Sequence, residues 1–209
     1  YALIHPENTP QNSPYKYLAG VGIAFMLSRY ICRKTNSNIN ELNSNILFCF
    51  GTIADMAPLI GANRKWLKES LPKINHCTNN GISAIIKKLK LEKFDITTDD
   101  IGFKIAPLIN AVGRIGNPQL IIDLLTSNSD IQASKLVDEC ICMNHERRKM
   151  TTLIEKEAIE IANNDIASHN KFFVISKMEW HSGIIGIVAA RLLDKFNIPT
   201  AILAGANDG

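Results

Sequence analysis

The chain contains 209 residues, of which 46% are hydrophobic and 21% are charged, and its formal net charge is +3 at neutral pH. This composition is typical of a globular chain with a sizeable core, and it excludes an intrinsically disordered protein. No apolar stretch reaches the roughly 20 residues that span a bilayer, and the N-terminus lacks the regions of a signal peptide. We therefore expect a cytoplasmic protein with no membrane partner.

The distribution of charge and the cysteine and histidine patterns indicate which partners and which kinds of site to expect. Residues 1–128 contain 14 Lys and Arg against 9 Asp and Glu, so a polyanion is expected to meet this section. The five cysteines include no C-x-x-C pair, and the five histidines show no metal-binding spacing. We expect reduced thiols and no self-contained zinc site.

The first predicted elements are a loop, a helix and a buried strand. Residues 1–17 hold three prolines and form a loop, whereas residues 18–34 carry apolar residues at helical spacing. The run "NILFCF" at 45–50 suits a strand buried on both faces. Such strands are typical of a parallel sheet covered by helices, so an α/β fold is predicted.

Asp55 follows this predicted strand within "GTIADMAPL", among Ile, Ala and Met residues. An isolated carboxylate in an apolar setting is unfavourable unless it is paired or binds a metal. Ligands of open α/β sheets bind beyond the carboxyl ends of the strands, which is where Asp55 is expected. Two roles stay open: a metal ligand, or a helix N-cap or turn carboxylate.

Helices are predicted next at 63–74 and 81–91, separated by a polar turn. The segment 97–127 then opens with a helix-start signal and carries a short helix into Pro107. It is expected to bend through residues 110–118 before another helix begins.

Arg114 lies in that predicted bend, between glycines and near Asn110. A guanidinium on a tight loop, with little bulk around it, suits bidentate phosphate binding. Anchoring of loop carbonyls is an equally ordinary role for such an arginine, so both interpretations stay open.

A single long helix is predicted in the second half of the chain. Neither Gly nor Pro occurs between Gln119 and Ser182, and apolar residues recur at helical spacing. We expect one helix of about 35 to 40 residues, from about Ser129 to about Ser168, that bridges two domains. The alternative, a coiled coil, is disfavoured because the apolar heptads are not sustained.

The end of the chain shows the pattern of a β-α-β unit. A strand is expected at 171–177, a helix at 183–196 and a second strand at 199–205. His181 lies in the turn after the first strand, facing whatever binds at the carboxyl edge of the sheet. A helix cap and a catalytic role both remain open for it.

Five stretches together carry a family resemblance. In chain order they are "LAGVGIAF", "GTIADMAPL", "INAVGRIGNP", the long helix with "MNHERRKM", and "WHSGIIGIVAARL". With them the chain resembles the RecJ family of single-strand-specific 5′ to 3′ DNA exonucleases, which belongs to the DHH phosphoesterase superfamily. The resemblance covers nearly the whole chain, and residues 65–100 are its least distinctive part.

The resemblance implies a domain organisation. Residues 1–128 would be the C-terminal part of a parallel-sheet DHH domain, 129–169 a connecting helix, and 170–209 the start of a second, DHH-associated α/β domain. Single-stranded DNA would pass through the cleft between the domains, with a single-strand-binding protein and a helicase as further partners.

The resemblance also implies roles for four residues. Asp55 would be a ligand of a catalytic pair of Mn²⁺ or Mg²⁺ ions, which supplies its missing partner. Arg114, with Asn110 near it, would hold the DNA phosphate. His181 would lie near the scissile phosphate.

Several motifs of the family are missing from this chain. In the family, two motifs with metal ligands precede this segment: the carboxylates of D-x-D and the Asp-His-His motif. A phosphate-binding motif with Ser and Arg and a Gly-Gly-His motif follow it. We therefore expect a central segment that is inactive alone. Two alternatives remain: another DHH phosphodiesterase or pyrophosphatase, and a non-catalytic nucleic-acid-binding protein in which Asp55 is structural.

Overall fold

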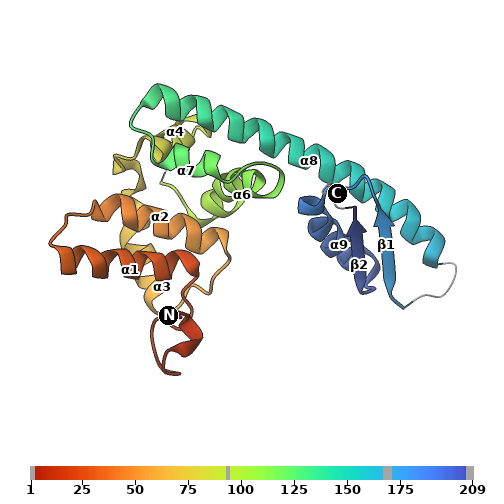
Figure 1. Ribbon diagram of the computed structural model, residues 1–209, viewed down its shortest axis with the longest axis horizontal. Coiled ribbons are helices and arrows are strands. Elements are labelled where there is room, and N and C mark those ends of the chain that lie inside the picture. The colour runs from red at the N-terminus through yellow and green to blue at the C-terminus, as the bar shows by residue number, and fades with distance from the viewer. Residues whose placement is uncertain (1–2, 93–94, 167–170, 206–209) are drawn as a thin grey trace. The chain divides into compact units, whose positions relative to one another are not determined.

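The computed structural model describes residues 3–92, 95–166 and 171–205 (Figure 1). The chain divides into two compact units, and each is described by itself. The first comprises Tyr1–Ile109 and Gln119–Asp138, and the second comprises Asn110–Pro118 and Glu139–Gly209. The architecture is mixed, with many helices and a small parallel sheet, as the sequence predicts.

The described residues of the first unit form helices and turns and no strand. Its regular helices begin with α1 (Gly20–Thr35), α2 (Glu41–Ala54), α3 (Gly61–Ser70) and α4 (Asn80–Lys88). A 3-10 turn, Leu71–His76, follows α3. The later elements are α5 (Thr98–Asp100), a π-helical turn (Ile101–Ile105), α6 (Ala106–Ile115), α7 (Gln119–Leu125) and α8 (Asp130–Ile166), of which α6 and α8 continue into the second unit.

The strand predicted at 45–50 is wrong, because these residues belong to α2. Asn40 caps this helix: its side chain accepts a hydrogen bond from the Asn43 amide at 3.0 Å. Phe48 and Cys49 are fully buried, and the Phe48 ring lies 5.3 Å from Phe25 of α1. A helix that is apolar on most sides packs inside a helical core, and a short apolar run alone does not distinguish it from a buried strand.

The bend predicted at 110–118 is also wrong over its first half. Residues Asn110 to Arg114 continue α6, so Arg114 occupies the last turn of a helix rather than a loop. Pro107 is the second residue of α6, and it follows the π-helical turn, in which the Ala106 amide bonds five residues back, to the Ile101 carbonyl. The π-helical turn directly before α6 lets the helical path continue through this position.

The long helix is confirmed. Helix α8 runs without a break for 37 residues, from Asp130 to Ile166 (Figure 1). The end predicted near Ser168 lies outside the described residues. Its charged middle, around Arg148 and Lys149, is exposed, as expected for a solvated face.

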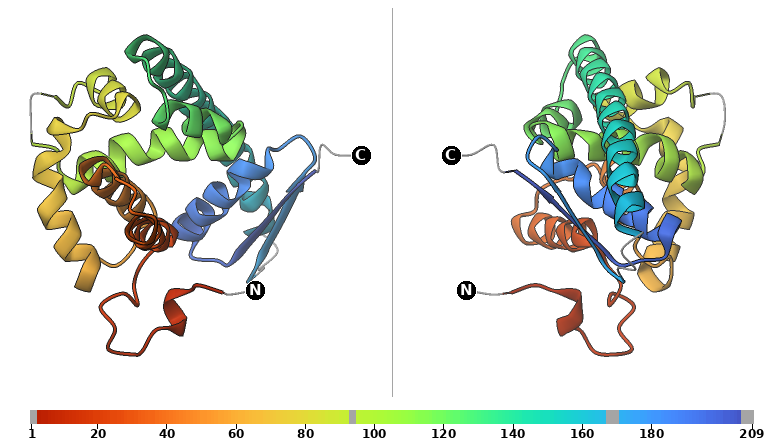
Figure 2. Two further views of the ribbon diagram at one scale, coloured as in Figure 1. Left: turned by 60° about the vertical axis from the view of Figure 1, so that its left-hand side comes forward. Right: turned by 90° about the vertical axis from the view of Figure 1, so that its right-hand side faces the viewer.

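The predicted β-α-β unit is confirmed in the second unit. Strands β1 (Phe173–Lys177) and β2 (Thr200–Ala204) pair in parallel, with Ile175 opposite Ile202, and α9 (Ser182–Phe196) connects them. Figure 2 shows the two strands side by side with α9 next to them. One face of the sheet packs on α8 and α9, through a core of Ile154, Ala158, Ala162, Phe173, Ile175, Trp180, Ile184, Val188, Leu192 and Ile202.

The opposite face of this sheet is open in the part of the chain that the structure describes. Val174 of β1 and Leu203 of β2 are 60% and 57% exposed, and they alternate with the buried residues of the core. Each strand has a single hydrogen-bonded neighbour there.

The five cysteines are free in the structure. Burial raises the pKa of the Cys49 thiol to about 12 and that of Cys140 to about 11, so both are protonated and inert at neutral pH. Among the described helices, none is both long enough and apolar enough to cross a membrane.

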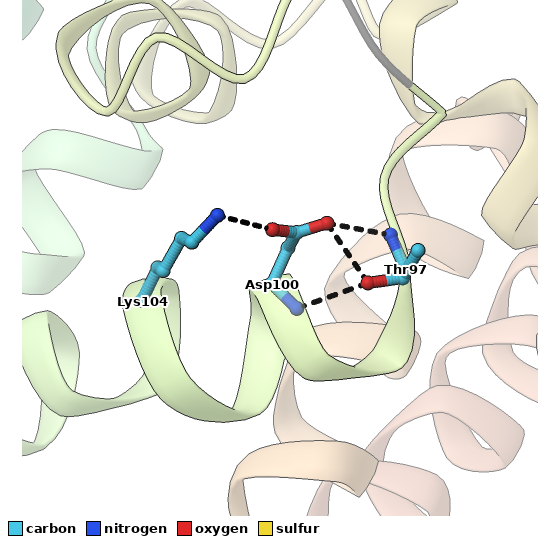
Figure 3. Close-up of polar contacts among 3 residues, drawn as sticks. All are labelled: Thr97, Asp100 and Lys104. Atoms are coloured by element: carbon cyan, nitrogen blue, oxygen red, sulfur yellow. Dashed lines mark hydrogen bonds and ion pairs between the residues drawn. The ribbon is translucent and has the colours of Figure 1, made fainter.

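A capping box starts the short helix α5 (Figure 3). Asp100 accepts hydrogen bonds from the backbone N–H of Thr97 at 3.0 Å and from its hydroxyl at 2.8 Å, and the Thr97 hydroxyl accepts one from the Asp100 amide. Lys104 donates to the second carboxylate oxygen at 2.6 Å. These contacts, Lys104 first, lower the pKa of Asp100 to about 2.

We expect Asp100→Asn to lower the free energy of unfolding by about 1 kcal/mol near pH 6, because it removes the ion pair with Lys104 and the negative charge that strengthens the two bonds from Thr97. The pKa of Asp100 is lower in the folded state, so its contribution is complete above about pH 4 and declines as the pH falls toward 2. Urea unfolding at pH 6 and pH 3 should therefore show a smaller effect at pH 3. Asp99→Asn, one residue earlier and exposed, is the control: it removes a first-turn charge without a capping bond, so it should lower the free energy of unfolding less than Asp100→Asn does at pH 6.

Candidate functional site

Asp55 is the C-cap residue of α2, not a residue at the end of a strand. Its backbone N–H bonds to the Gly51 carbonyl at 3.0 Å, while its side chain is exposed and has no hydrogen-bond or ion-pair partner among the described residues. The C-terminal end of a helix carries the negative end of the helix dipole, which disfavours a carboxylate and favours a cation. The N-cap role that the sequence left open is thereby excluded.

A Schellman motif holds Asp55 in place. The Met56 amide bonds to the Ile53 carbonyl at 3.0 Å and the Ala57 amide to the Thr52 carbonyl at 3.1 Å. Met56 takes a left-handed conformation, with φ of +54°, which glycine usually occupies at this position. A side chain there is strained, so the turn after Asp55 is maintained at a cost in stability.

Met56→Gly is expected to raise the free energy of unfolding by about 0.5 to 1 kcal/mol, because glycine adopts a positive φ without strain. Little packing is lost, since Met56 is 89% exposed. Urea unfolding measures the change. Asn197→Gly is the matched control: Asn197 has φ of +54° after α9, but asparagine already tolerates this conformation, so its replacement should have little effect.

Thr52 and Asp55, near the end of α2, both lack a hydrogen-bond partner for their side chains among the described residues. Thr52 lies one turn before Asp55 and is fully buried, and its hydroxyl has no hydrogen-bond partner among the described residues. An exposed carboxylate with no partner can supply one oxygen ligand to a hard divalent cation. Within the described residues no three His, Cys, Asp or Glu side chains gather into a group that could hold a metal ion.

Arg114 and His181 come together in the second unit, around Gly183. A guanidinium nitrogen of Arg114, Nη1, donates to the Gly183 carbonyl at 3.3 Å, and His181 Nδ1 accepts from the Gly183 amide at 3.0 Å. The packing there is close: a Cβ atom added to Gly183 would lie 2.0 Å from the Arg114 carbonyl oxygen. Asn110 lies one turn before Arg114 on α6 and is exposed, so the two side chains share a helix face.

His181 is the N-cap of α9. Because Nδ1 accepts a hydrogen bond, a neutral His181 carries its proton on Nε2, and that nitrogen is left to interact with a ligand. The capping role and a role toward substrate are therefore compatible.

A buried tryptophan fixes the turn that carries His181. Glu157 of α8 accepts hydrogen bonds through one carboxylate oxygen, Oε2, from Trp180 Nε1 at 2.8 Å and from Lys177 Nζ at 2.7 Å. Trp180 is 4% exposed. The Lys177 and Trp180 bonds lower the pKa of Glu157, and the Glu157 bond raises that of Lys177. The sequence pattern gave no sign of this contact, since Glu157 is one of several acidic residues on a long helix.

Comparison with known proteins gives one consistent result, although no family model matches the chain. The Single-stranded-DNA-specific exonuclease RecJ of Bacillus subtilis is 32% identical over 202 residues, covering 97% of this chain and 25% of the relative. The protein of the same name from Escherichia coli is 29% identical over 223 residues, covering 100% of this chain and 38% of the relative.

Solved structures agree with these relatives. A crystal structure of RecJ in complex with Mn²⁺ from Thermus thermophilus superposes with a TM-score of 0.83 at 29% identity, covering 96% of this chain and 29% of that one. A crystal structure of exonuclease RecJ bound to manganese has the same TM-score and covers 96% of this chain and 50% of that one. The chain thus matches a segment of RecJ and spans 25% to 38% of the curated relatives described above.

Proposed function

Because the chain corresponds to a segment of RecJ, we propose that it is part of a longer metal-dependent exonuclease. This enzyme hydrolyses phosphodiester bonds of single-stranded DNA from the 5′ end, in recombination and repair. The observation that carries the proposal is the match to RecJ, over 97% of the chain in sequence and over 96% in structure, at a TM-score of 0.83. In this proposal residues 1–128, 129–169 and 170–209 are the DHH part, the connector and the DHH-associated part.

Asp55 is the residue that this chain contributes to the metal site of the enzyme. Its exposed carboxylate lies at a helix C-terminus and has no partner in the part of the chain that the structure describes, so it fits Mn²⁺ or Mg²⁺, the ions named in the RecJ structures. When bound, such a pair of ions activates a water and stabilises the leaving oxygen of a phosphodiester. The other ligands come from outside these residues, so we expect the segment alone to be inactive.

The second unit contributes the residues that hold the strand. Arg114 donates to a phosphate oxygen, with Asn110 beside it on the same helix face, and His181 presents Nε2 to the phosphate near the scissile bond. Glu157 and Trp180 keep the His181 turn in place. A cytoplasmic location and recruitment by a single-strand-binding protein and a helicase belong to the same proposal.

The test is a degradation assay with the whole enzyme that contains this chain. Oligonucleotides labelled at the 5′ or the 3′ end, single-stranded or duplex, are incubated with Mn²⁺, Mg²⁺ or a chelator. We expect metal-dependent release of 5′ nucleotides from single strands and little action on duplexes. Preferential hydrolysis of pyrophosphate or of a cyclic dinucleotide would contradict the proposal and favour another DHH phosphoesterase.

Arg114→Ala tests the phosphate contact. Affinity for single strands should fall with salt with a log-log slope of about −0.7 per phosphate neutralised, and this variant should make the slope shallower by about one such contact. Fluorescence anisotropy at several salt concentrations measures both quantities. Lys195→Ala is the control that should keep the wild-type slope, because Lys195 lies in the last turn of α9, at the end away from His181 and Gly183. An unchanged slope for Arg114→Ala would remove this residue from the DNA path.

A further inference from the structure

Arg147 occupies a position of α8 that the helical pattern assigns to the core of the second unit. The buried residues of α8 in this region include Cys140, Thr151 and Ile154, which lie on one face of the helix. Arg147 lies on the same face, because it is seven residues after Cys140, four before Thr151 and seven before Ile154. Arg147 itself is half-buried, whereas its neighbour Arg148 is exposed. Arg147 therefore places a positive charge at a position of α8 where an apolar side chain is expected.

The described surroundings of Arg147 do not neutralise its charge. Its Nε and Nη2 atoms donate to Asn144 Oδ1 at 3.3 and 3.0 Å, and none of the ion pairs among the described residues includes it. Burial first, and then the positive charges of Arg148, Arg114 and Arg191, lower its pKa. A partly desolvated cation among other cations is unfavourable without an anion.

Arg147 lies near the C-terminal end of α6, which carries Arg114. A Cβ atom on Gly116, two residues after Arg114, would lie 2.8 Å from the Cε atom of Met143, which is one turn before Arg147 on α8. Arg114 in turn bonds to Gly183 beside His181. Arg191 already pairs with Glu155, whereas Arg114, Arg147 and the exposed Arg148 have no carboxylate partner among the described residues.

We propose that Arg147 and Arg114 form a two-guanidinium site for one phosphate group. A guanidinium has five N–H donors, and the two that Arg147 gives to Asn144 orient the planar group and leave the others for an anion. The inference rests on the proposed function in one respect: the phosphate is taken to belong to the backbone of the bound single strand. Arg148, on the exposed side of the same helix, has no part in this site.

The decisive variant is Arg147→Met in the whole enzyme, with Arg148→Met as the matched control. If the cation is kept for an anion, Arg147→Met should raise the thermal unfolding midpoint in phosphate-free buffer, because it removes a desolvated charge from among like charges. The same variant should weaken single-strand binding about tenfold or more and make the salt slope shallower by about 0.7. Arg148→Met should change the affinity less than threefold.

A structural role for Arg147 gives the opposite pair of results. Arg147→Met would then lower the midpoint and leave affinity and salt slope unchanged, and this outcome overturns the inference. Arg147→Lys serves if the Met variant does not fold: it keeps the charge and loses the planar fork, so stability should stay near wild type while affinity falls severalfold. Wild-type affinity in the Lys variant also overturns the inference.

Inorganic phosphate separates this inference from the proposed function. In a thermal unfolding assay without DNA, added phosphate should raise the midpoint of the wild type more than that of Arg147→Met. Equal shifts in the two proteins overturn the inference, whatever the DNA results. If the enzyme fails to degrade single strands, the proposed function falls, while the phosphate assay still decides whether the two arginines bind an anion.

Discussion

Asp55→Asn is expected to lower the nuclease activity of the whole enzyme by orders of magnitude. The amide has the size of the carboxylate but lacks the negative charge that a pair of divalent cations requires, so the affinity for Mn²⁺ should fall as well. The fold should remain, because Asn suits a helix C-terminus at least as well as Asp does. Activity assays, Mn²⁺ titration and urea unfolding give the three readouts.

The competing explanation makes a different forecast for the same variant. If Asp55 only ends α2, then Asn in its place should leave exonuclease activity almost intact, and the metal-ligand role would have to be abandoned. Asp99→Asn, which removes a carboxylate from an exposed position of the same unit, controls for the loss of charge and should retain full activity.

Gly183→Ala should have the second largest effect. The added Cβ would lie 2.0 Å from the carbonyl oxygen of Arg114, a backbone atom that has no rotamer to change. We expect the free energy of unfolding to fall by about 2 to 3 kcal/mol and the activity to fall with it, since Arg114 and His181 both bond to Gly183. Urea unfolding and strand degradation measure the two losses.

Gly186→Ala is the matched control for that substitution. It lies one turn later in α9 and nothing lies within 4 Å of the position of its Cβ, so alanine should stabilise the helix by about 1 kcal/mol. Opposite signs for the two alanines would support the close contact at Gly183. A loss of similar size in both would show instead that α9 tolerates no alanine.

The parts of the fold that the sequence predicts correctly are those with an unambiguous period. Helix α8 has neither Gly nor Pro, and the alternation in β1 and the helical pattern in α9 each admit one interpretation. Residues 45–50 show no helical or strand period, because α2 is buried on most sides. A short apolar run of this kind suits a buried strand of an α/β fold equally well. At 110–118 the glycines suggested a bend, but Gly113 is accommodated inside α6.

Some residues of the candidate site could be proposed from the sequence, and others could be recognised only in the structure. Asp55, Arg114 and His181 could be proposed as site residues because each belongs to a short motif, although the elements that carry the first two were wrongly assigned. Glu157 and Arg147 were missed because their roles depend on contacts distant along the chain: Glu157 bonds to residues 20 and 23 positions away. Arg147 does carry one signal in the sequence, a charge in the buried stripe of an amphipathic helix.

The open face of the small sheet has a practical consequence for anyone who prepares this protein. Val174 and Leu203 expose apolar surface, and each described strand has a backbone edge with no partner. Two-stranded sheets are marginal in water, and free edges next to apolar side chains recruit strands from other molecules. Samples limited to these residues would therefore be prone to association, and polypeptides that extend the sheet would be the better choice for crystallisation and for every assay described above.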